Sequence, residues 1–322
     1  MSDVPKVELH VHLEGTAPPD LIRRLAERNG LAVPEGVFAA PSRFAYTDFL
    51  DFLKTYDKAA SVIRTGEDYR DITYEYLVSC AAEGAIYVEL TASPDHARLA
   101  GLGDDEHMDG IARGIDDARA ESGVEGRILI SCVRNFGVEQ ALRVASYAAE
   151  RPHPYVVGFS MAGDEENYPP AAYEEAFQIA AAAGLGCSVH AGEWAGPDSV
   201  REGLRLPVSR IGHGVRSIED PALVKELASR GTVLEVCPTS NVVLGIYPTY
   251  EEHPLPRLLD AGVQVTLGSD DPPYFGATIG AEYAVCAEHF RLDDEALRGI
   301  TLTAIDAAFC EETLKQRLMQ TV

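Results

Sequence analysis

The sequence predicts an α/β protein with the architecture of a (β/α)8 TIM barrel, and three observations support that prediction. Short, β-branched apolar runs alternate with helical stretches about eight times along the 322 residues. The apolar runs are nearly continuous, as in parallel strands that are covered on both faces. No Gly-x-Gly-x-x-Gly motif follows the first run, which disfavours the alternative of an open doubly wound sheet.

Eight segments are predicted as barrel strands. In chain order they are Val7–His12, Ala85–Thr91, Gly126–Val133, Tyr155–Met161, Cys187–Ala191, Arg210–Gly214, Thr232–Pro238 and Val263–Ser269. Helices are expected between them, and three of these end at Gly30, Gly184 and Gly231, because glycine commonly terminates a helix. With neither a linker rich in Pro and Gly nor an internal repeat, residues 1–322 are expected to form one domain.

One connection is much longer than the others. It joins the first predicted strand to the second, and its pattern predicts an extra helical insertion. Within it, Phe49, Leu50 and Leu53 lie close together. They fit an apolar lid beside a binding site or ordinary helix packing equally well, although long loops on the C-terminal rim of a barrel usually serve the site.

The composition excludes several classes of partner. The chain has 27 Lys and Arg against 51 Asp and Glu, a formal net charge of −24. Such a surface repels phosphate, so we expect no nucleic-acid binding and no adsorption to anionic membranes. The six cysteines are irregularly spaced, and we find neither a signal pattern nor an apolar run of membrane length. These features favour reduced thiols and a soluble cytoplasmic protein, whose oligomeric state the sequence does not predict.

Ionisable side chains gather where predicted strands end. His10 and His12 lie two residues apart in the first strand, so both rings face the same side. Alone, this pair fits a core or surface position as well as a metal site. His190 and His213 end two further strands, and Asp270 and Asp271 end the last. Burying so many ionisable groups near one axis is costly unless they pair or bind a cation.

The ligand types favour zinc, with one ion per chain. Three imidazoles and one carboxylate suit zinc and leave a position for water, although iron, cobalt or manganese could use the same ligands. A binuclear site is less favoured because the end of the fourth strand, GFSMAG, offers no bridging lysine or glutamate. Zinc would lower the pKa of bound water to about 7, His213 can polarise that water, and Glu193 can carry a proton. Together these parts indicate metal-assisted hydrolysis at an electrophilic carbon.

Six motifs in this order make the assignment more specific. They are PKVELHVHLEG, MAGDE, HAGE, RIGHG, VCPTSN and SDDP, and together they run from Pro5 to Pro272. The set resembles the adenosine deaminase family within the amidohydrolase superfamily. The resemblance implies a small purine nucleoside or base as substrate and ammonia as a product.

The resemblance also implies roles for individual residues. The implied zinc ligands are His10, His12, His190 and Asp270. Glu193 would share a proton with the purine ring nitrogen, and His213 would orient the attacking water. Asp271 would accept a hydrogen bond from the imidazole ring of the purine, and the backbone N–H of Gly163 would meet its pyrimidine side. Cys237 fits packing at a strand end better than nucleophilic chemistry, because no base is placed to activate it.

Two positions give opposite indications about the substrate. Glu14 stands where adenosine deaminases carry an Asp that contacts a ribose hydroxyl, and glutamate is common there in relatives that act on adenine. MAGDE, by contrast, resembles the adenosine-type segment. We therefore expect zinc-dependent deamination of adenosine and 2′-deoxyadenosine to the corresponding inosines. The alternatives are an adenine deaminase, a deaminase of a 5′-modified adenosine and, less favoured, a non-catalytic purine-binding protein.

Overall fold

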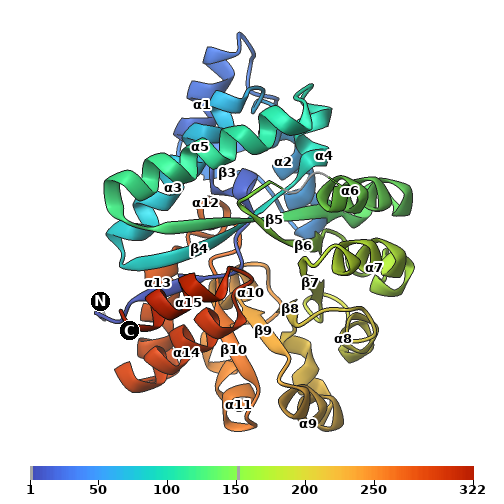
Figure 1. The fold of residues 1–322 in the computed structure, drawn as a ribbon, viewed down its shortest axis with the longest axis vertical. Coiled ribbons are helices and arrows are strands. Elements are labelled where there is room, and N and C mark those ends of the chain that lie inside the picture. Colours follow the sequence, from blue (N-terminus) through green and yellow to red (C-terminus); the bar gives the residue numbers. More distant parts are fainter. Residues whose placement is uncertain (1–2, 151–152) are drawn as a thin grey trace.

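Eight parallel strands form a nearly closed barrel at the centre of the computed structural model, which describes residues 3–150 and 153–322 (Figure 1). The strands are β1 (Lys6–Glu8), β4 (Ala85–Ala92), β5 (Glu125–Val133), β6 (Val156–Ala162), β7 (Gly186–Ala191), β8 (Arg210–His213), β9 (Val233–Val236) and β10 (Gln264–Leu267). They neighbour one another in chain order. The predicted (β/α)8 barrel is therefore confirmed, with most strand ends within two residues of the prediction.

The first strand departs most from its predicted length. The regular ladder of β1 stops at Glu8, whereas the prediction continued it to His12. Beyond it the chain pairs only through two isolated bridges, Val11 with Asp270 and His12 with Thr91. These bridges contact the ends of β10 and β4 on either side, so they close the barrel at the rim where the predicted ligands lie.

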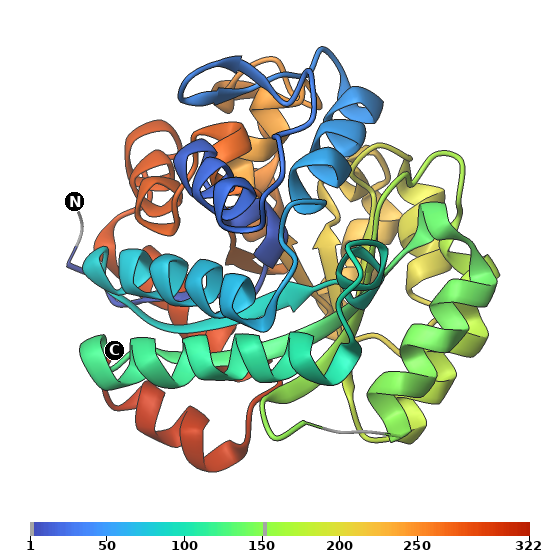
Figure 2. The same ribbon diagram turned by 90° about the horizontal axis from the view of Figure 1, so that it is seen from above.

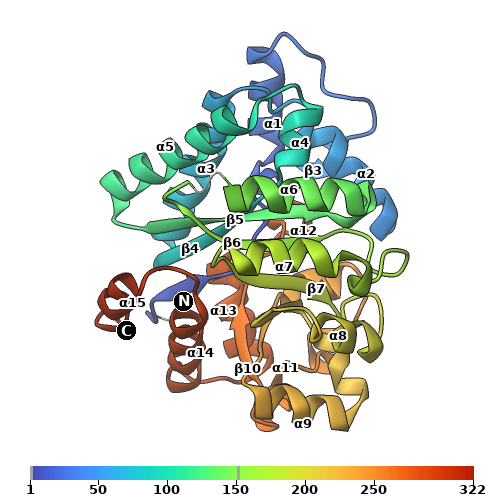
Figure 3. The same cartoon turned by 45° about the vertical axis from the view of Figure 1, so that its right-hand side comes forward.

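Helices cover the outside of the barrel. Between and after the strands run α4 (Pro94–Leu99), α5 (Asp104–Ser122), α6 (Val138–Glu150), α7 (Glu174–Ala182), α8 (Pro197–Gly203), α9 (Pro221–Arg230), α10 (Pro238–Val243), α11 (Leu255–Asp260), α12 (Pro272–Phe275), α13 (Ile279–His289), α14 (Asp294–Ala307) and α15 (Glu312–Met319). Figure 3 shows α6 and α7 lying side by side on the outer surface. Among the described residues, no helix is both long enough and apolar enough to cross a membrane.

The long insertion is largely helical, as expected, but it also contains a small hairpin. Its helices are α1 (Pro19–Arg28), α2 (Phe49–Ala60) and α3 (Gly66–Ala82), and its hairpin pairs β2 (Phe38–Ala40) with β3 (Arg43–Phe44). Asp48 caps α2, and a reciprocal capping box at Thr65 and Asp68 begins α3. α3 then packs along α5, as Figure 2 shows. The hairpin is too short and too exposed to give an apolar pattern.

All six cysteines are buried and unpaired. Burial raises the pKa of each thiol, because a thiolate loses its hydration in the protein interior. Cys237, at the end of β9, is among the thiols shifted furthest. These environments fit the packing role expected for Cys237 rather than a nucleophilic one.

A buried ionic network joins three barrel strands. Arg210 of β8 pairs with Glu89 of β4 at 2.7 Å and with Glu235 of β9 at 2.6 Å. Glu235 also meets Nδ1 of His10 at 3.1 Å and accepts a hydrogen bond from Ser188 of β7 at 2.9 Å. Arg210 and Glu89 are fully buried, so each charge depends on its partners for the interactions that water would otherwise provide.

Replacing Arg210 tests this dependence. Arg210→Leu leaves Glu89 and Glu235 buried without their cation, which typically costs about 3–5 kcal/mol. We expect a decrease of that size in the free energy of unfolding, measured by urea denaturation. Arg317→Leu is the control, because Arg317 pairs with Glu125 from an exposed position and should cost at most about 1 kcal/mol. Equal losses in the two variants would contradict this assignment.

Candidate active site

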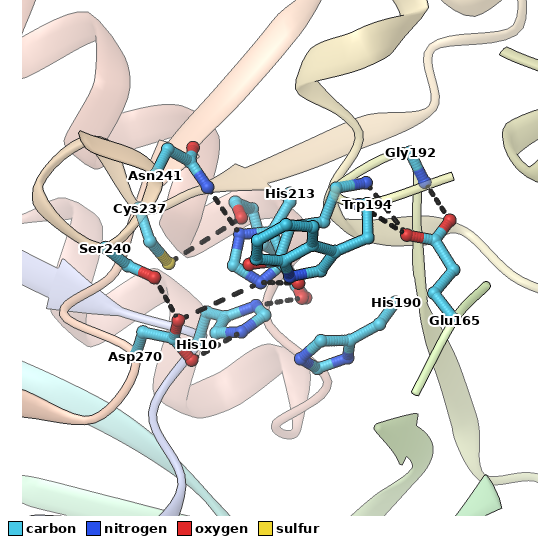
Figure 4. A network of polar contacts seen from close by, with 12 residues as sticks. His10, Glu165, His190, Gly192, Trp194, His213, Cys237, Ser240, Asn241 and Asp270 are labelled. Carbon is cyan, nitrogen blue, oxygen red and sulfur yellow. Dashed lines mark hydrogen bonds and ion pairs between the residues drawn. The ribbon is translucent and has the colours of Figure 1, made fainter. Parts of the chain in front are cut away.

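The structure brings the predicted metal ligands, together with His213, to the C-terminal rim of the barrel. Figure 4 shows His10, His190, His213 and Asp270 turned toward one another from separate parts of the chain. One potential ligand atom from each of these four lies within 4.8 Å of the others. His12 joins the group from beside Asp270, with which Asp271 also clusters.

Three distances within the cluster are close to the edges of a tetrahedron around a metal ion. His12 Nε2 lies 3.2 Å from His190 Nε2 and 3.3 Å from Asp270 Oδ1. His10 Nε2 lies 3.5 Å from the same Asp270 oxygen. Ligand atoms about 2.0–2.1 Å from a tetrahedral zinc ion would be about 3.3–3.4 Å apart. His10 Nε2 is buried and makes no hydrogen bond among the described residues, so a bound cation would supply the partner that this nitrogen lacks.

Two of the clustered side chains project from unusual backbone. His213 and Asp270 adopt φ of 59° and 63°, left-handed values that are uncommon outside glycine. Such strain is typical of functional sites, where the surrounding structure holds it in place. Gly212 provides room beside them, because a Cβ there would lie 2.9 Å from the His10 ring and 3.1 Å from His190 Nδ1.

A second layer of contacts orients the clustered groups. Glu235 holds Nδ1 of His10, so that Nε2 faces the cluster. Ser240 donates its hydroxyl hydrogen to Asp270 Oδ2 at 2.6 Å. These partners fix the ring and the carboxylate before any ligand arrives, which is typical of metal sites.

The electrostatics of the cluster favour a cation. Burial opposes ionisation of Asp270, but contacts with His10 and His12 hold its pKa well below the usual range. Burial also lowers the pKa of His10, yet Asp270 and Glu235 outweigh it and raise that pKa to about 10. Burial and neighbouring imidazoles keep the pKa of His190 low, so its ring is neutral as metal binding requires. The side chains present therefore fit a divalent metal ion.

Glu193 lies just beyond β7, on a loop held by Glu165 of the MAGDE motif. The Glu165 carboxylate accepts hydrogen bonds from the backbone N–H groups of Gly192, Glu193, Trp194 and Ala195. Figure 4 shows this carboxylate facing Gly192 and Trp194. The acidic end of MAGDE thus shapes the loop that carries Glu193.

The environment of Glu193 favours its protonated form. Its Oε2 lies 3.7 Å from His213 Nε2, and the side chain is buried in the pocket wall. Burial, together with the charges of Asp270 and Glu165, raises the pKa of Glu193 well above its usual range. A carboxyl group that keeps its proton near neutral pH can donate that proton to a substrate nitrogen.

Asp271 and Gly163, which were predicted to contact the substrate, border the same cavity as Glu193. Asp271 is buried, and burial together with the charge of Asp270 raises its pKa well above the usual range. Its Oδ1 makes no hydrogen bond among the described residues. Gly163 has a φ of 106°, and a Cβ there would lie 2.3 Å from Asn135 Oδ1. The positive φ and the close approach of Asn135 therefore both favour glycine at this position.

Glu14 contributes a buried carboxylate to another part of the cavity wall. Tyr56 and Tyr69 donate their hydroxyl hydrogens to it at 3.3 Å, and the backbone N–H of Ser93 donates at 3.1 Å. Burial and the charge of Glu14 raise the pKa of both tyrosines well above 10, so both remain donors. This carboxylate is fixed in position before a substrate binds.

Apolar side chains of α2 form part of the cavity wall. Phe49, Phe52 and Leu53 border the cavity, which supports the lid interpretation for Phe49 and Leu53. Leu50 is 45% exposed and lies outside the cavity wall, so its inclusion in a lid was wrong. The helical period turns Leu50 away from the face shared by Phe49 and Leu53. Phe49 also stacks on Trp194, with ring centroids 4.8 Å apart, linking α2 to the Glu193 loop.

Several residues of the site were missed by the sequence analysis. Glu165 lay within a quoted motif, but nothing local indicates that it binds a loop beyond β7. Glu235 lies inside the apolar run Thr232–Pro238, but its partners Arg210 and His10 are distant in sequence. Arg134 donates to the backbone carbonyls of His190 and Tyr168, although neither is near it in sequence. Ionisable residues inside apolar runs are the available signal, because they need buried partners.

Comparison with known proteins agrees with this geometry. The adenosine deaminase family model matches residues 5–322. An adenine deaminase of Chelativorans sp. (strain BNC1) is 48% identical over 314 residues, covering 97% of this chain and 96% of that protein. The chain belongs to the adenosine deaminase family of the amidohydrolase superfamily.

Two solved structures share the fold over nearly the whole chain. The adenine deaminase of Arthrobacter aurescens has a TM-score of 0.91 and 30% identity, with 98% of this chain and 97% of that chain covered. An amidohydrolase of Burkholderia ambifaria with bound Zn has a TM-score of 0.89 and 26% identity, with 99% and 89% covered. The family membership establishes a hydrolytic deaminase that acts on C–N bonds.

These relatives overturn the main substrate expectation. Adenosine and 2′-deoxyadenosine were favoured because of MAGDE. The Chelativorans relative and the Arthrobacter aurescens structure, however, are both named adenine deaminases. The structure gives the physical reason. Glu165 binds a loop, and Asp164 accepts hydrogen bonds from Asn167, so these two acidic groups are occupied by the chain itself. MAGDE therefore carries less information about the sugar than the sequence analysis assumed.

His107, which lies behind Glu14, provides a test of the buried wall. Its Nε2 is 3.9 Å from Glu14 Oε1, and burial lowers its pKa to about 3. The folded protein then holds this ring neutral, whereas the unfolded chain protonates it near pH 6.5. Its contribution to stability is complete above pH 6.5 and is lost as the pH falls toward 3. His107→Leu should flatten the pH dependence of the unfolding free energy by up to about 1.4 kcal/mol per pH unit.

The measurement is urea denaturation at pH values between 6.5 and 4. His289→Leu, at the exposed end of α13, is the matched control and should reproduce the wild-type slope. A His107→Leu variant with the wild-type slope would show that the ring is not held neutral.

Proposed function

We propose that this chain is a zinc-dependent adenine deaminase that converts adenine and water into hypoxanthine and ammonia. The observation that carries the proposal is the fixed carboxylate of Glu14 in the cavity wall. The five-membered ring of free adenine carries an N–H group, which can donate a hydrogen bond to such a carboxylate. Adenosine lacks that hydrogen because its N9 is bonded to ribose. The similarity to adenine deaminases over nearly the whole chain supports this assignment.

In this proposal the metal ligands are His10, His12, His190 and Asp270, and the ion is zinc. The relative with bound Zn and the composition of the cluster support that choice. When bound, zinc would supply a water made nucleophilic at neutral pH. The remaining steps belong to side chains of the cavity.

Glu193 begins the reaction by donating its proton to N1 of the purine. Protonation draws electron density from C6, which then bonds to the water oxygen. His213 positions and polarises that oxygen. Asp271 contacts the water and, in the protonated form that its raised pKa favours, donates to the five-membered-ring nitrogen that carries no hydrogen. The backbone N–H of Gly163 contacts the pyrimidine side. One proton of the attacking water passes to the amino nitrogen, the C6–N bond breaks, and ammonia leaves with the bonding electron pair. The other water proton returns to Glu193, and the oxygen remains as the C6 carbonyl of hypoxanthine.

A substrate comparison tests the assignment directly. Purified zinc-loaded protein should release ammonia from adenine with a kcat/KM at least about 10²-fold above that for adenosine or 2′-deoxyadenosine. Glu14→Gln should lower kcat/KM for adenine by about 10-fold or more, because an amide is a weaker acceptor than a carboxylate. Glu67→Gln, on an exposed helix start, is the control. Equal rates on adenine and adenosine would refute the role of Glu14.

Replacing the proton carrier separates binding from chemistry. Glu193→Gln keeps the size of the side chain but cannot supply the carboxyl proton. We expect metal content and adenine binding close to wild type, with kcat reduced by about 10²–10⁴-fold. Metal analysis and calorimetric titration with adenine measure the first two properties, and ammonia release measures the third. Turnover near the wild-type rate would remove Glu193 from this role.

A further inference from the structure

We propose that Asn241 and His253 are positioning residues that fix the tautomer of His213, so that its pocket-facing Nε2 carries the hydrogen. Hydrogen bonds along Leu255, His253, Asn241 and His213 support the assignment. The catalytic use of that hydrogen rests on the proposed function, whereas the tautomer itself does not.

The backbone N–H of Leu255 determines which group donates and which accepts in each hydrogen bond of this series. Its backbone N–H lies 3.2 Å from Nδ1 of His253 and can only donate. Nδ1 of His253 must therefore accept. His253 is 3% exposed, and burial lowers its pKa to about 3, so the ring is neutral. A neutral imidazole that accepts at Nδ1 carries its hydrogen on Nε2.

The side-chain amide of Asn241 links His253 to His213 and so determines the hydrogen-bonding role of His213 Nδ1. Nε2 of His253 lies 3.2 Å from Asn241 Oδ1, which accepts its hydrogen. The other end of the amide, Nδ2, then lies 3.3 Å from Nδ1 of His213, as Figure 4 shows. An amide nitrogen can only donate, so Nδ1 of His213 accepts. Asn241 and His213 are almost completely buried, and no water is needed to complete the chain.

The remaining nitrogen of His213 faces the reaction centre. Nε2 lies 3.7 Å from Glu193 Oε2 and 3.9 Å from Asp270 Oδ2. With its hydrogen on Nε2, the ring presents a donor to an oxygen that gains negative charge as it attacks the purine. The opposite tautomer would present a lone pair there and would also set its Nδ1–H against the amide hydrogens of Asn241.

The decisive variant is Asn241→Asp, which keeps the size of the side chain and removes its only donor. A carboxylate accepts from both His253 and His213, so the hydrogen of His213 should move to Nδ1. Nitrogen-15 NMR of histidine-labelled, zinc-loaded protein distinguishes protonated from unprotonated ring nitrogens. The His213 signal is assigned by its loss in His213→Gln. We expect Nε2–H in the wild type, Nδ1–H in Asn241→Asp, and a fall in kcat of about 10²-fold or more.

Substitutions at His253 separate positioning from folding. His253→Gln retains an amide donor near the position of Nε2, so it should preserve the Nε2–H signal of His213. His253→Leu removes the donor and should reduce that signal together with kcat. Both comparisons remain informative if Asn241→Asp does not fold. His153→Leu, just before β6 and remote from the cavity, is the matched control.

The outcomes distinguish this inference from the proposed function. A wild-type Nδ1–H signal for His213 would overturn it, as would an Asn241→Asp variant that keeps both Nε2–H and kcat. A wild type that shows Nε2–H but no turnover of adenine would support the tautomer assignment and refute the proposed function instead. Metal content unchanged across the variants would show that the tautomer, rather than loss of zinc, accounts for the fall in rate.

Discussion

The pairing of Arg210 with Glu89 and Glu235 is the interaction on which both the barrel and its rim depend. It joins β4, β8 and β9 through charges that water cannot reach. Glu235 is shared, because it also holds the outer nitrogen of His10. A buried ion pair adds little stability compared with apolar packing, but it specifies which strands must meet. In this protein the same pairing specifies the orientation of an imidazole at the metal cluster.

Neighbouring carboxyl groups at the rim have pKa values that are shifted in opposite directions. The imidazoles around Asp270 hold its pKa well below the usual range, whereas burial beside Asp270 raises the pKa of Glu193 and of Asp271 and favours their protonated forms. Pairs of acidic groups whose pKa values are driven apart in this way commonly divide the tasks of binding and proton transfer. Asp270 thus has the charge that a cation requires, and Glu193 has the proton that a ring nitrogen requires.

The fold was predictable because its signals are local. Apolar runs and helix-ending glycines located the strands and helices within a few residues, and the order of the strands followed from the barrel. The hairpin at Phe38–Ala40 and Arg43–Phe44 was missed because strands of two or three residues leave no period to detect. At the site, histidines at strand ends gave a local signal. The Glu165 loop contact, the Glu235 ion pair and the Asn241–His253 contact gave none, because each depends on residues brought together only by folding. The substrate expectation failed for the same reason, since the sequence of MAGDE does not show which way its carboxylates turn.

Because all six thiols are buried, the rate at which each one reacts would report local opening of the structure around it. Cys132 on β5 and Cys187 on β7 lie on different strands of the barrel, Cys286 lies on the outer helix α13, and none is linked to another. An alkylating reagent can reach each sulfur only when the surrounding segment separates from its neighbours. The rate of modification at each cysteine, resolved by mass spectrometry, would therefore distinguish segments that open locally from segments that open only when the whole protein unfolds.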